Sequence, residues 1–244
     1  MANLGDKTKH KANLYSADCL AGYRANHDLR NNHLLTRVFY IIVLLWDYEC
    51  MKKTKSTNRA YYLILSIGGA LGMIAMTWQA SERIAMLKNP TAPLNCNISP
   101  VIDCGTVLGN KLAALFGFPN AFIGMIVFSM LALAGIAGLS GVVYTKAFKS
   151  VVLTLSTILL LFSMWFFGAS LYSIGKICIF CAVGWVVSLP IFVYSLTDWL
   201  EDKKSGNYKK FYAWLNSNKM TVLVTWYIIL ICLFLYRFRD YYFN

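Results

Sequence analysis

Five apolar segments dominate this chain, and each is long enough to cross a lipid bilayer as a helix. A spanning helix needs about 20 apolar residues. Charged residues are correspondingly scarce, at 14% of the chain, whereas soluble domains carry about 25%. The sequence therefore predicts an all-α membrane protein, with a four-helix transmembrane bundle and a fifth C-terminal transmembrane helix. The segments cover residues 61–79, 120–139, 151–172, 177–197 and 220–236.

The basic residues predict how these segments are oriented. The net charge of +12 would suit a nucleic-acid partner, but the Lys and Arg residues fall in short clusters between apolar segments. Such clusters are topology signals, because positively charged loops stay in the cytoplasm. We therefore expect residues 80–119, residues 173–177 and the C-terminal tail to lie outside the cytoplasm. The cytoplasmic set is Lys52, Lys53, Lys55, Arg59, Lys146, Lys149, Lys203, Lys204, Lys209, Lys210 and Lys219, and the opposite set is Arg83, Lys88, Lys111, Lys176, Arg237 and Arg239.

The N-terminal part of the chain differs from the rest. It is polar and holds all three histidines, and its apolar stretch at residues 38–46 is too short to span a bilayer. Cys19 and Cys50 lie there and would face the reducing cytoplasm as ordinary free thiols. The expected organisation is a polar extension over residues 1–50 whose role the sequence leaves open, a four-helix domain over residues 51–219, and a fifth helix with a short tail over residues 220–244.

Four other cysteines form two pairs on the expected outer side. Cys96 and Cys104 lie in the long loop after the first segment, and Cys178 and Cys181 form a Cys-x-x-Cys pair where the fourth segment begins. A zinc site is one use of such a set, but zinc ligands are usually two to four residues apart, and seven residues separate Cys96 from Cys104. Structural disulfides and an electron relay are the other two uses.

The Cys-x-x-Cys spacing favours the relay. A disulfide across so short a loop adds little stability, and this spacing is used where a bridge must open and close. A thiolate attacks a disulfide, so electrons can pass from one pair to the other. At the membrane edge the acceptor would be a lipid-soluble two-electron carrier, for which a quinone is the obvious candidate.

The alternatives are a non-enzymatic membrane module held by structural disulfides and a small transporter. No Asp, Glu or His occurs between Gly105 and Thr197. Because transporters usually need ionisable groups inside the membrane, this absence disfavours the transporter.

Two stretches together resemble a known family. CNISPVIDCGTVLGNKLAALFGFPNAFIG, at residues 96–124, is followed by CIFCAVGW, at residues 178–185. This order of cysteine pairs and the Gly-Phe-Pro-Asn helix start are similar to the vitamin K epoxide reductase family, over roughly residues 60–197. The bacterial disulfide-bond B type carries its Cys-x-x-Cys in the first outer loop and fits less well. The resemblance implies a four-helix bundle around a quinone of the menaquinone or ubiquinone type, in a bacterial cytoplasmic membrane.

The resemblance also implies a role for each site residue. Cys181 would react with the quinone ring, Cys178 would exchange with Cys104, and Cys96 would receive electrons from a thioredoxin-fold partner. The partner is expected to be a separate protein, because the chain ends shortly after the fifth segment. Oxidation of that partner would support disulfide-bond formation in secreted proteins. Asn120 would donate a hydrogen bond to a quinone carbonyl, and a helix N-cap is its ordinary alternative.

Two positions depart from the family pattern. Trp185 stands where animal members carry Tyr, so it would form a wall of the quinone pocket without donating a phenolic proton; a core aromatic is the simpler alternative. Asn110 stands where the family has Ser. Apolar residues near helical spacing predict a short helix over residues 105–117. This helix would cap the quinone pocket or, alternatively, lie at the interface with no catalytic role.

Overall fold

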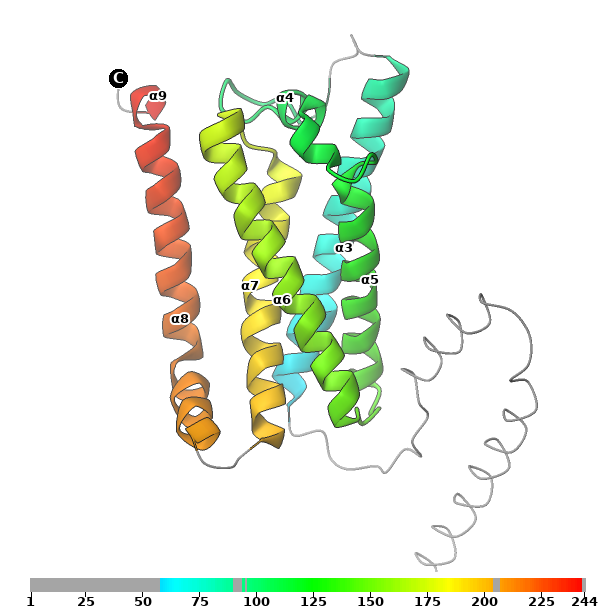
Figure 1. The fold of residues 1–244 in the computed structure, drawn as a ribbon, viewed down its shortest axis with the longest axis vertical. Helices are drawn as coiled ribbons and strands as arrows, with labels where there is room; N and C mark the ends of the chain where they lie inside the picture. Colours follow the sequence, from blue (N-terminus) through cyan, green and yellow to red (C-terminus); the bar gives the residue numbers. More distant parts are fainter. Residues whose placement is uncertain (1–57, 90–93, 95, 204–206, 243–244) are drawn as a thin grey trace, which may run out of the picture.

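The structure, a computed structural model, describes residues 58–89, 94, 96–203 and 207–242. The expected N-terminal extension, with Cys19 and Cys50, lies outside the described residues. Over the described part the chain is helical with no strand, and five helices are long and apolar enough to cross a membrane. The predicted all-α membrane fold is confirmed (Figure 1). The five are α3 (Arg59–Lys88), α5 (Asn120–Leu139), α6 (Lys146–Ala169), α7 (Ile179–Asp202) and α8 (Asn207–Arg237).

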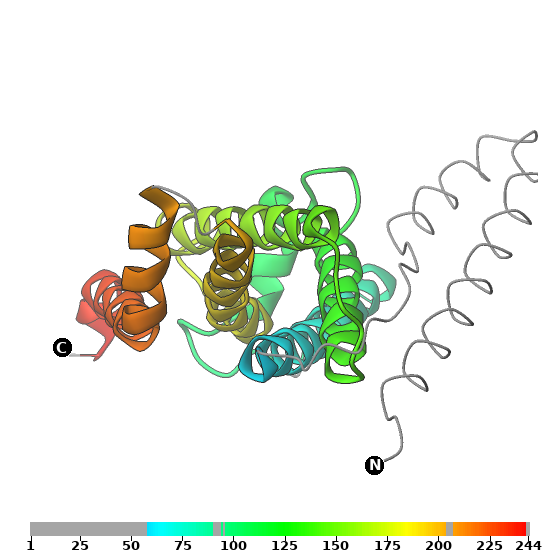
Figure 2. The same ribbon diagram turned by 90° about the horizontal axis from the view of Figure 1, so that it is seen from below.

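Four of these helices form a bundle, and the fifth lies beside it. Helix α7 packs against both α3 and α6, α3 packs against α5, and α8 packs on the outer side of α7 (Figure 2). The centre of the bundle is closed by large side chains that are almost fully buried, and hydrophobic burial of this kind fixes which face of each helix points inward. They include Leu65, Phe128, Leu131 and Ile191.

Helices α3 and α5 approach so closely that their backbones touch. A Cβ atom on Gly69 would lie 2.6 Å from the backbone nitrogen of Ala132. A Cβ atom on Gly135 would likewise meet the backbone of Ser66. In lipid, where apolar side chains gain little by avoiding the solvent, such close van der Waals contact is what holds helices together.

The connections that carry the cysteines meet at one end of the bundle. Helix α3 runs toward this end, α5 runs away from it, α6 returns, α7 leaves again and α8 comes back (Figure 1). The α3–α5 connection, the α6–α7 connection and α9 (Arg239–Tyr242) therefore lie together. The charge pattern grouped the same segments on one side. That this side faces away from the cytoplasm stays a prediction.

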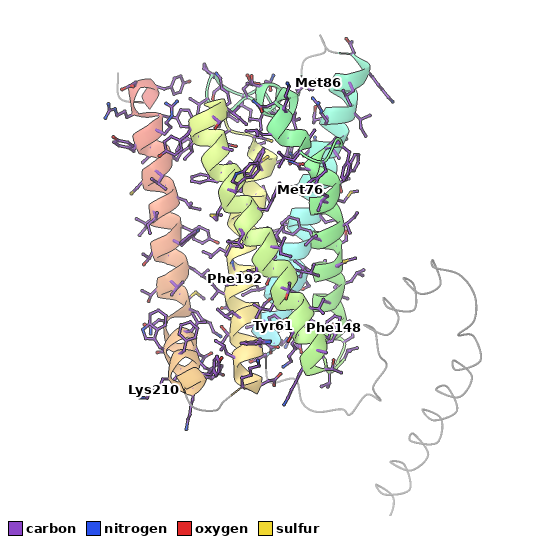
Figure 3. All side chains as sticks on the ribbon, in the orientation of Figure 1. Tyr61, Met76, Met86, Phe148, Phe192 and Lys210 are labelled. Carbon is purple, nitrogen blue, oxygen red and sulfur yellow. A yellow bond between two sulfur atoms is a disulfide. The ribbon has the colours of Figure 1, made fainter. Side chains whose placement is uncertain are left out.

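The first helix is longer than its apolar segment. Helix α3 continues nine residues beyond residue 79, to Lys88. These additional turns bring Met86 against the cysteine-bearing loop, while Met76 faces the bundle interior lower on the same helix (Figure 3). Glu82, in these turns, is a buried polar side chain, and so is Gln79, the last residue of the apolar segment.

The prediction of one continuous helix over residues 105–117 is wrong. Two short helices occupy this stretch, α4 (Cys104–Gly109) and the 3₁₀-helix η1 (Lys111–Ala114). Asn110 separates them, because its backbone is extended and its side-chain oxygen accepts a hydrogen bond from the Leu112 amide at 2.9 Å. The chain therefore turns at Asn110.

Helix α8 also begins earlier than its apolar segment. It starts at Asn207 and bends at Asn218, where φ and ψ are −109° and 16°. The Asn218 carboxamide donates to the Trp214 carbonyl at 2.8 Å. The apolar part of α8 follows this bend, which agrees with the predicted span over residues 220–236.

Candidate active site

The loop cysteines are joined to each other. Cys96 and Cys104 form a disulfide with their Cα atoms 5.6 Å apart. Cys104 opens α4, and Asp103 caps this helix by accepting hydrogen bonds from the amide and hydroxyl of Thr106, at 3.1 and 2.6 Å. Asn97 accepts a further bond from the Gly105 amide at 3.1 Å. Local capping therefore fixes the loop around the disulfide.

The Cys-x-x-Cys pair lies at the start of α7 with both thiols free. Cys178 is the residue just before the helix and Cys181 lies in its first turn, and both are buried. A hydrogen bond from the Cys181 thiol lowers the pKa of Cys178, with further help from the backbone amides of Phe180 and Cys181. A thiol of lowered pKa yields more thiolate, which is the nucleophilic form. Cys178 thus loses its proton more readily than an ordinary cysteine.

Two backbone hydrogen bonds align the loop with the start of α7. Ile102 and Ile177 form an isolated parallel bridge. The Asp103 amide donates to the Ile177 carbonyl at 3.1 Å, and the Ile177 amide donates to the Val101 carbonyl at 2.9 Å. Cys178 follows Ile177 directly and Cys104 is two residues after Ile102, so the bridge sets the relative positions of these two cysteines.

All four cysteines belong to one buried apolar cluster. Cys104 and Cys178 have no exposed surface, and Cys96 and Cys181 are 2% and 5% exposed. The sequence places the two pairs far apart in the chain, and the fold brings them together. Zinc does not fit this arrangement, because the sulfurs of Cys96 and Cys104 are bonded to each other rather than held as thiolates. Cys232, by contrast, is exposed on α8.

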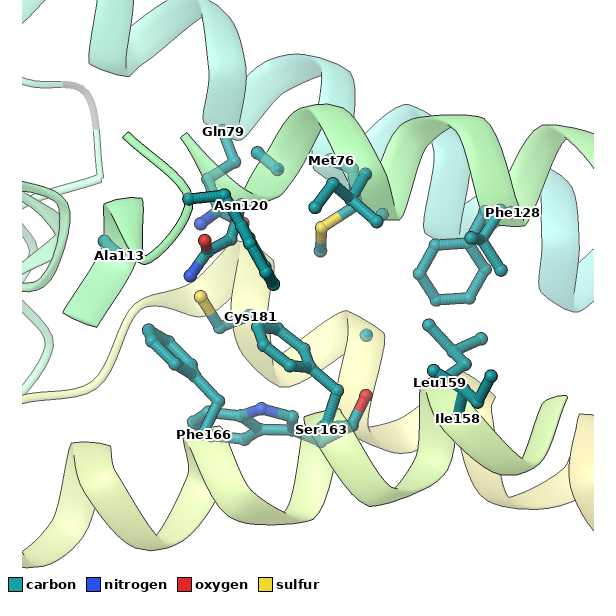
Figure 4. Close-up of a pocket in the computed structure, with 18 of the residues that line it drawn as sticks. Met76, Gln79, Ala113, Asn120, Phe128, Ile158, Leu159, Ser163, Phe166 and Cys181 are labelled. Carbon is teal, nitrogen blue, oxygen red and sulfur yellow. The ribbon is translucent and has the colours of Figure 1, made fainter. Parts of the chain in front are cut away.

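An apolar cavity of about 190 Å³ opens beside Cys181. Its wall is built from α3, α5, α6 and α7, with η1 closing one end (Figure 4). The wall is mostly aromatic and aliphatic, with few polar groups, as is usual for sites that bind apolar ligands. Aromatic and aliphatic wall residues include Met76, Phe116, Phe128, Leu159, Phe162, Phe166 and Trp185.

Trp185 is both a cavity residue and a core aromatic, and its role as a wall of a quinone pocket stays a prediction. It lines the cavity, and it packs in the core, with its ring centre 5.0 Å from that of Phe167 in an edge-on arrangement. It is 6% exposed.

Asn120 lines the cavity but does not cap its helix. Its side-chain nitrogen donates to the Leu112 carbonyl at 2.7 Å, and its oxygen accepts from the Leu115 amide at 3.1 Å. The N-cap of α5 is Pro119, so the N-cap alternative is wrong. The carboxamide instead fastens η1 over the end of the cavity. A carboxamide nitrogen has two N–H donors, so one remains for a ligand.

Gln79 is a cavity residue that the sequence analysis missed. It lines the cavity at 5% exposure, and its side-chain oxygen has no hydrogen-bond partner. Its carboxamide is a hydrogen-bonding neighbour of the Cys181 thiol. The available signal was its position as the last residue of the first apolar segment, where a polar side chain is costly unless it is paired. An unpaired buried acceptor costs about 1–3 kcal/mol, so a ligand group that donates to it would be stabilised.

This fold and this site define a helical membrane protein of the thiol oxidoreductase class, in which a buried dithiol and a disulfide adjoin an apolar cavity. The family model of the vitamin K epoxide reductase family matches residues 61–196. This match covers more than half of the chain, and the chain therefore belongs to that family. Membership implies a membrane enzyme that couples thiol oxidation to quinone or epoxide reduction. Comparison with curated protein sequences finds no match.

Proposed function

We propose that this protein oxidises a separate thioredoxin-fold protein outside the cytoplasm and transfers the electrons to a membrane quinone. The observation that carries the proposal is the single buried cluster that holds both cysteine pairs beside the apolar cavity. A cluster of this kind offers a continuous route from a loop that a protein partner can reach to a cavity that a lipid-soluble molecule can occupy. The proposed setting is a bacterial cytoplasmic membrane, and the proposed result is disulfide formation in exported proteins.

The route begins at the loop disulfide. A partner thiolate attacks Cys96, so that the bond to Cys104 breaks and a mixed disulfide with the partner forms. The partner's second thiolate then releases Cys96, which leaves the partner oxidised and both loop cysteines reduced. The roles of Cys96 and Cys104 follow from their order in the family resemblance, and the exposed loop residue Asn97 marks the side from which a partner approaches Cys96.

Electrons then pass from the loop to the membrane-edge pair. Cys104 attacks an oxidised Cys178–Cys181 pair at Cys178, and Cys96 completes the exchange, so that the loop disulfide is restored. The backbone bridge supports this step because it places Cys104 and Cys178 on adjacent segments.

The last step reduces the quinone. The two thiols of Cys178 and Cys181 lose two electrons and two protons and become a disulfide, and the quinone gains both to become a hydroquinone. Cys181 is proposed to meet the ring, because it lines the cavity whereas Cys178 does not. The apolar wall would hold a menaquinone or ubiquinone ring, and the remaining N–H of Asn120 would donate to a ring carbonyl.

The test is turnover by the full-length protein in detergent, with a reduced thioredoxin-fold protein as electron donor and a short-chain quinone as acceptor. The wild-type protein should reduce the quinone, and Cys181→Ala should lower the rate to that of the uncatalysed mixture. Cys232→Ala is the matched control, because this cysteine is exposed on α8 outside the cluster, and it should retain full activity. Quinone reduction that survives Cys181→Ala would refute the assignment.

A further inference from the structure

Two carboxamides converge with Cys181 at one end of the cavity. Gln79 comes from α3 and Asn120 from the start of α5, and both point toward the Cys181 sulfur (Figure 4). Both are buried, at 5% and 9% exposure. The two carboxamides differ in which hydrogen-bonding group remains unpaired, and this difference decides which ligand the cavity favours.

Asn120 has a donor left. Its oxygen is occupied by the Leu115 amide and one of its N–H groups by the Leu112 carbonyl. These two bonds fix the orientation of the carboxamide, because exchanging its oxygen and nitrogen would set donor against donor at Leu115. The second N–H is therefore the group that Asn120 presents to the cavity.

Gln79 has an acceptor left. Its oxygen is buried without a partner, while its carboxamide interacts with the Cys181 thiol. A carbonyl oxygen accepts hydrogen bonds and cannot donate one. An oxygen of a quinone ring is also only an acceptor, so it gains nothing from this group and is repelled by it. A ring hydroxyl, in contrast, can donate to it.

We propose that Gln79 is a specificity-determining residue that recognises the hydroxyl group of a reduced ring, so that the cavity binds a hydroquinone more tightly than the corresponding quinone. This inference rests on the proposed function for the identity of the ring. Asn120 pairs with either oxidation state, because both a carbonyl and a hydroxyl oxygen accept a hydrogen bond. The Gln79 oxygen pairs with the ring only after the ring has gained two electrons and two protons from the thiols of Cys178 and Cys181.

The consequence is that binding favours the direction of electron flow from sulfur to ring. A site that binds the product better than the substrate shifts the equilibrium on the protein toward reduction. The same preference predicts inhibition by accumulated hydroquinone, which the membrane would relieve by drawing the product into the lipid.

The experiment compares the binding of the two oxidation states. Dissociation constants are measured by calorimetry, without oxygen, for a short-chain benzoquinone and for its hydroquinone. The full-length protein carries Cys181→Ser in every sample, so that no reaction with the ring occurs while a hydrogen-bonding group stays beside Gln79. Gln79→Met removes the acceptor and keeps the length of the side chain. Thr77→Val is the matched control, since the Thr77 hydroxyl bonds to the Met73 carbonyl on the exposed face of α3.

Gln79→Met should raise the dissociation constant of the hydroquinone by about two- to tenfold, which corresponds to one hydrogen bond. That of the quinone should stay within about twofold, and Thr77→Val should alter neither. A purely structural role would weaken both forms equally, and that result would overturn the proposal, as would no change in either form or no binding of either. If Gln79→Met does not fold, Gln79→Asn tests the same point by withdrawing the oxygen one methylene from the cavity.

The proposed function is tested separately. Turnover with all cysteines intact measures it, and a wild-type protein that binds the hydroquinone preferentially yet reduces no quinone would refute the function and leave the binding preference standing. Turnover in the wild-type protein combined with equal binding of the quinone and the hydroquinone would refute the binding preference and leave the proposed function standing.

Discussion

Ile102 and Ile177 pair through their backbones as residues of neighbouring parallel strands do, although the described residues form no strand. The bond from the Ile177 amide to the Val101 carbonyl, at 2.9 Å, is one of two that fasten the outer loop to the start of α7. Because Cys104 and Cys178 follow this bridge closely on the two segments, it aligns the two cysteine pairs. This alignment leads to the first prediction.

Ile177→Pro should uncouple the two pairs, because Pro has no amide hydrogen to donate to Val101. In a protein whose other site cysteines are replaced, by Cys96→Ala and Cys181→Ala, mild oxidation should join Cys104 to Cys178. The loss of one hydrogen bond should lower the yield of this disulfide about fivefold, as measured by mass spectrometry of the digested protein.

The control for this change is Ile179→Pro. Ile179 is the first residue of α7, a position where Pro is well tolerated because its amide needs no helical partner. The disulfide yield should be retained there. Equal yields in Ile177→Pro and the unsubstituted background would show that the bridge does not align the pairs.

The partner should be trapped when Cys104 is removed. With Cys104→Ala the Cys96 thiol has no bonding partner within the loop. Mild oxidation in the presence of a thioredoxin-fold partner whose second cysteine is replaced should then join Cys96 to the remaining partner thiol, and neither Cys104 nor a second partner thiol is present to displace it. Mass spectrometry of the full-length variant isolated with the candidate partner should find this adduct. The adduct should disappear in Cys104→Ala combined with Cys96→Ala, and its persistence there would mean that another thiol receives the electrons.

Gly69→Val should destabilise the bundle. A Cβ at this position would lie 2.6 Å from the backbone nitrogen of Ala132, so α3 and α5 must separate to admit a side chain. Overpacking of this kind costs about 1–3 kcal/mol, which should appear as a lower thermal unfolding temperature in detergent. Gly168→Ala is the control, since its Cβ would meet nothing within 4 Å. It should be neutral or slightly stabilising, because Ala favours a helix more than Gly does.

Acid should loosen the loop that carries Cys104. Burial raises the pKa of Asp103, but hydrogen bonds from Thr106 and the positive charge of Lys176 outweigh it, so the pKa of this carboxyl is lowered. A carboxyl with a lowered pKa in the folded state stabilises that state above its unfolded pKa of about 4. The stabilisation is lost as the pH falls from there through the lower folded value.

Hydrogen exchange of the α4 amides should therefore quicken as the pH is lowered through this window, beyond the intrinsic dependence of exchange on pH. Asp103→Ala should remove the effect and weaken the loop by about 1 kcal/mol at neutral pH, as loss of an N-cap does. Asp103→Asn, which keeps a capping oxygen without a titrating proton, should restore most of the stability and none of the acid sensitivity. If Asp103→Asn remained sensitive to acid, the titrating group would be one other than Asp103.

The number of spanning helices and their approximate positions were predictable from the sequence. The five apolar segments correspond to α3, α5, α6, α7 and α8, because the thickness of the bilayer sets a minimum length that few other structures require. The ends of the helices were less predictable. Helix α3 continues to Lys88 through Glu82 and Arg83, where hydropathy falls although the helical hydrogen bonds continue.

The cysteines of the candidate site were predictable from the sequence, but the prediction of its polar groups was incomplete. Cys96, Cys104, Cys178 and Cys181 are identified by spacing and by family resemblance, and the structure gathers them in one cluster. Gln79 carries no such signal. A single polar residue at the end of an apolar segment looks like the edge of the membrane until the packing of α3 against α5 and α7 shows that it faces the cavity.

The sequence by itself determined the helical membrane fold, the family and the choice of the four candidate cysteines. The length of an apolar segment and the spacing of cysteines can both be measured along the chain without knowledge of its fold. Only the tertiary structure decided that Ile102 bridges to Ile177, that Asn120 fastens η1 instead of capping α5, and that Gln79 is left with an unpaired oxygen. These are contacts between segments far apart in the chain. They depend on how close the packed helices come, as at Gly69, and that distance is set by the whole bundle.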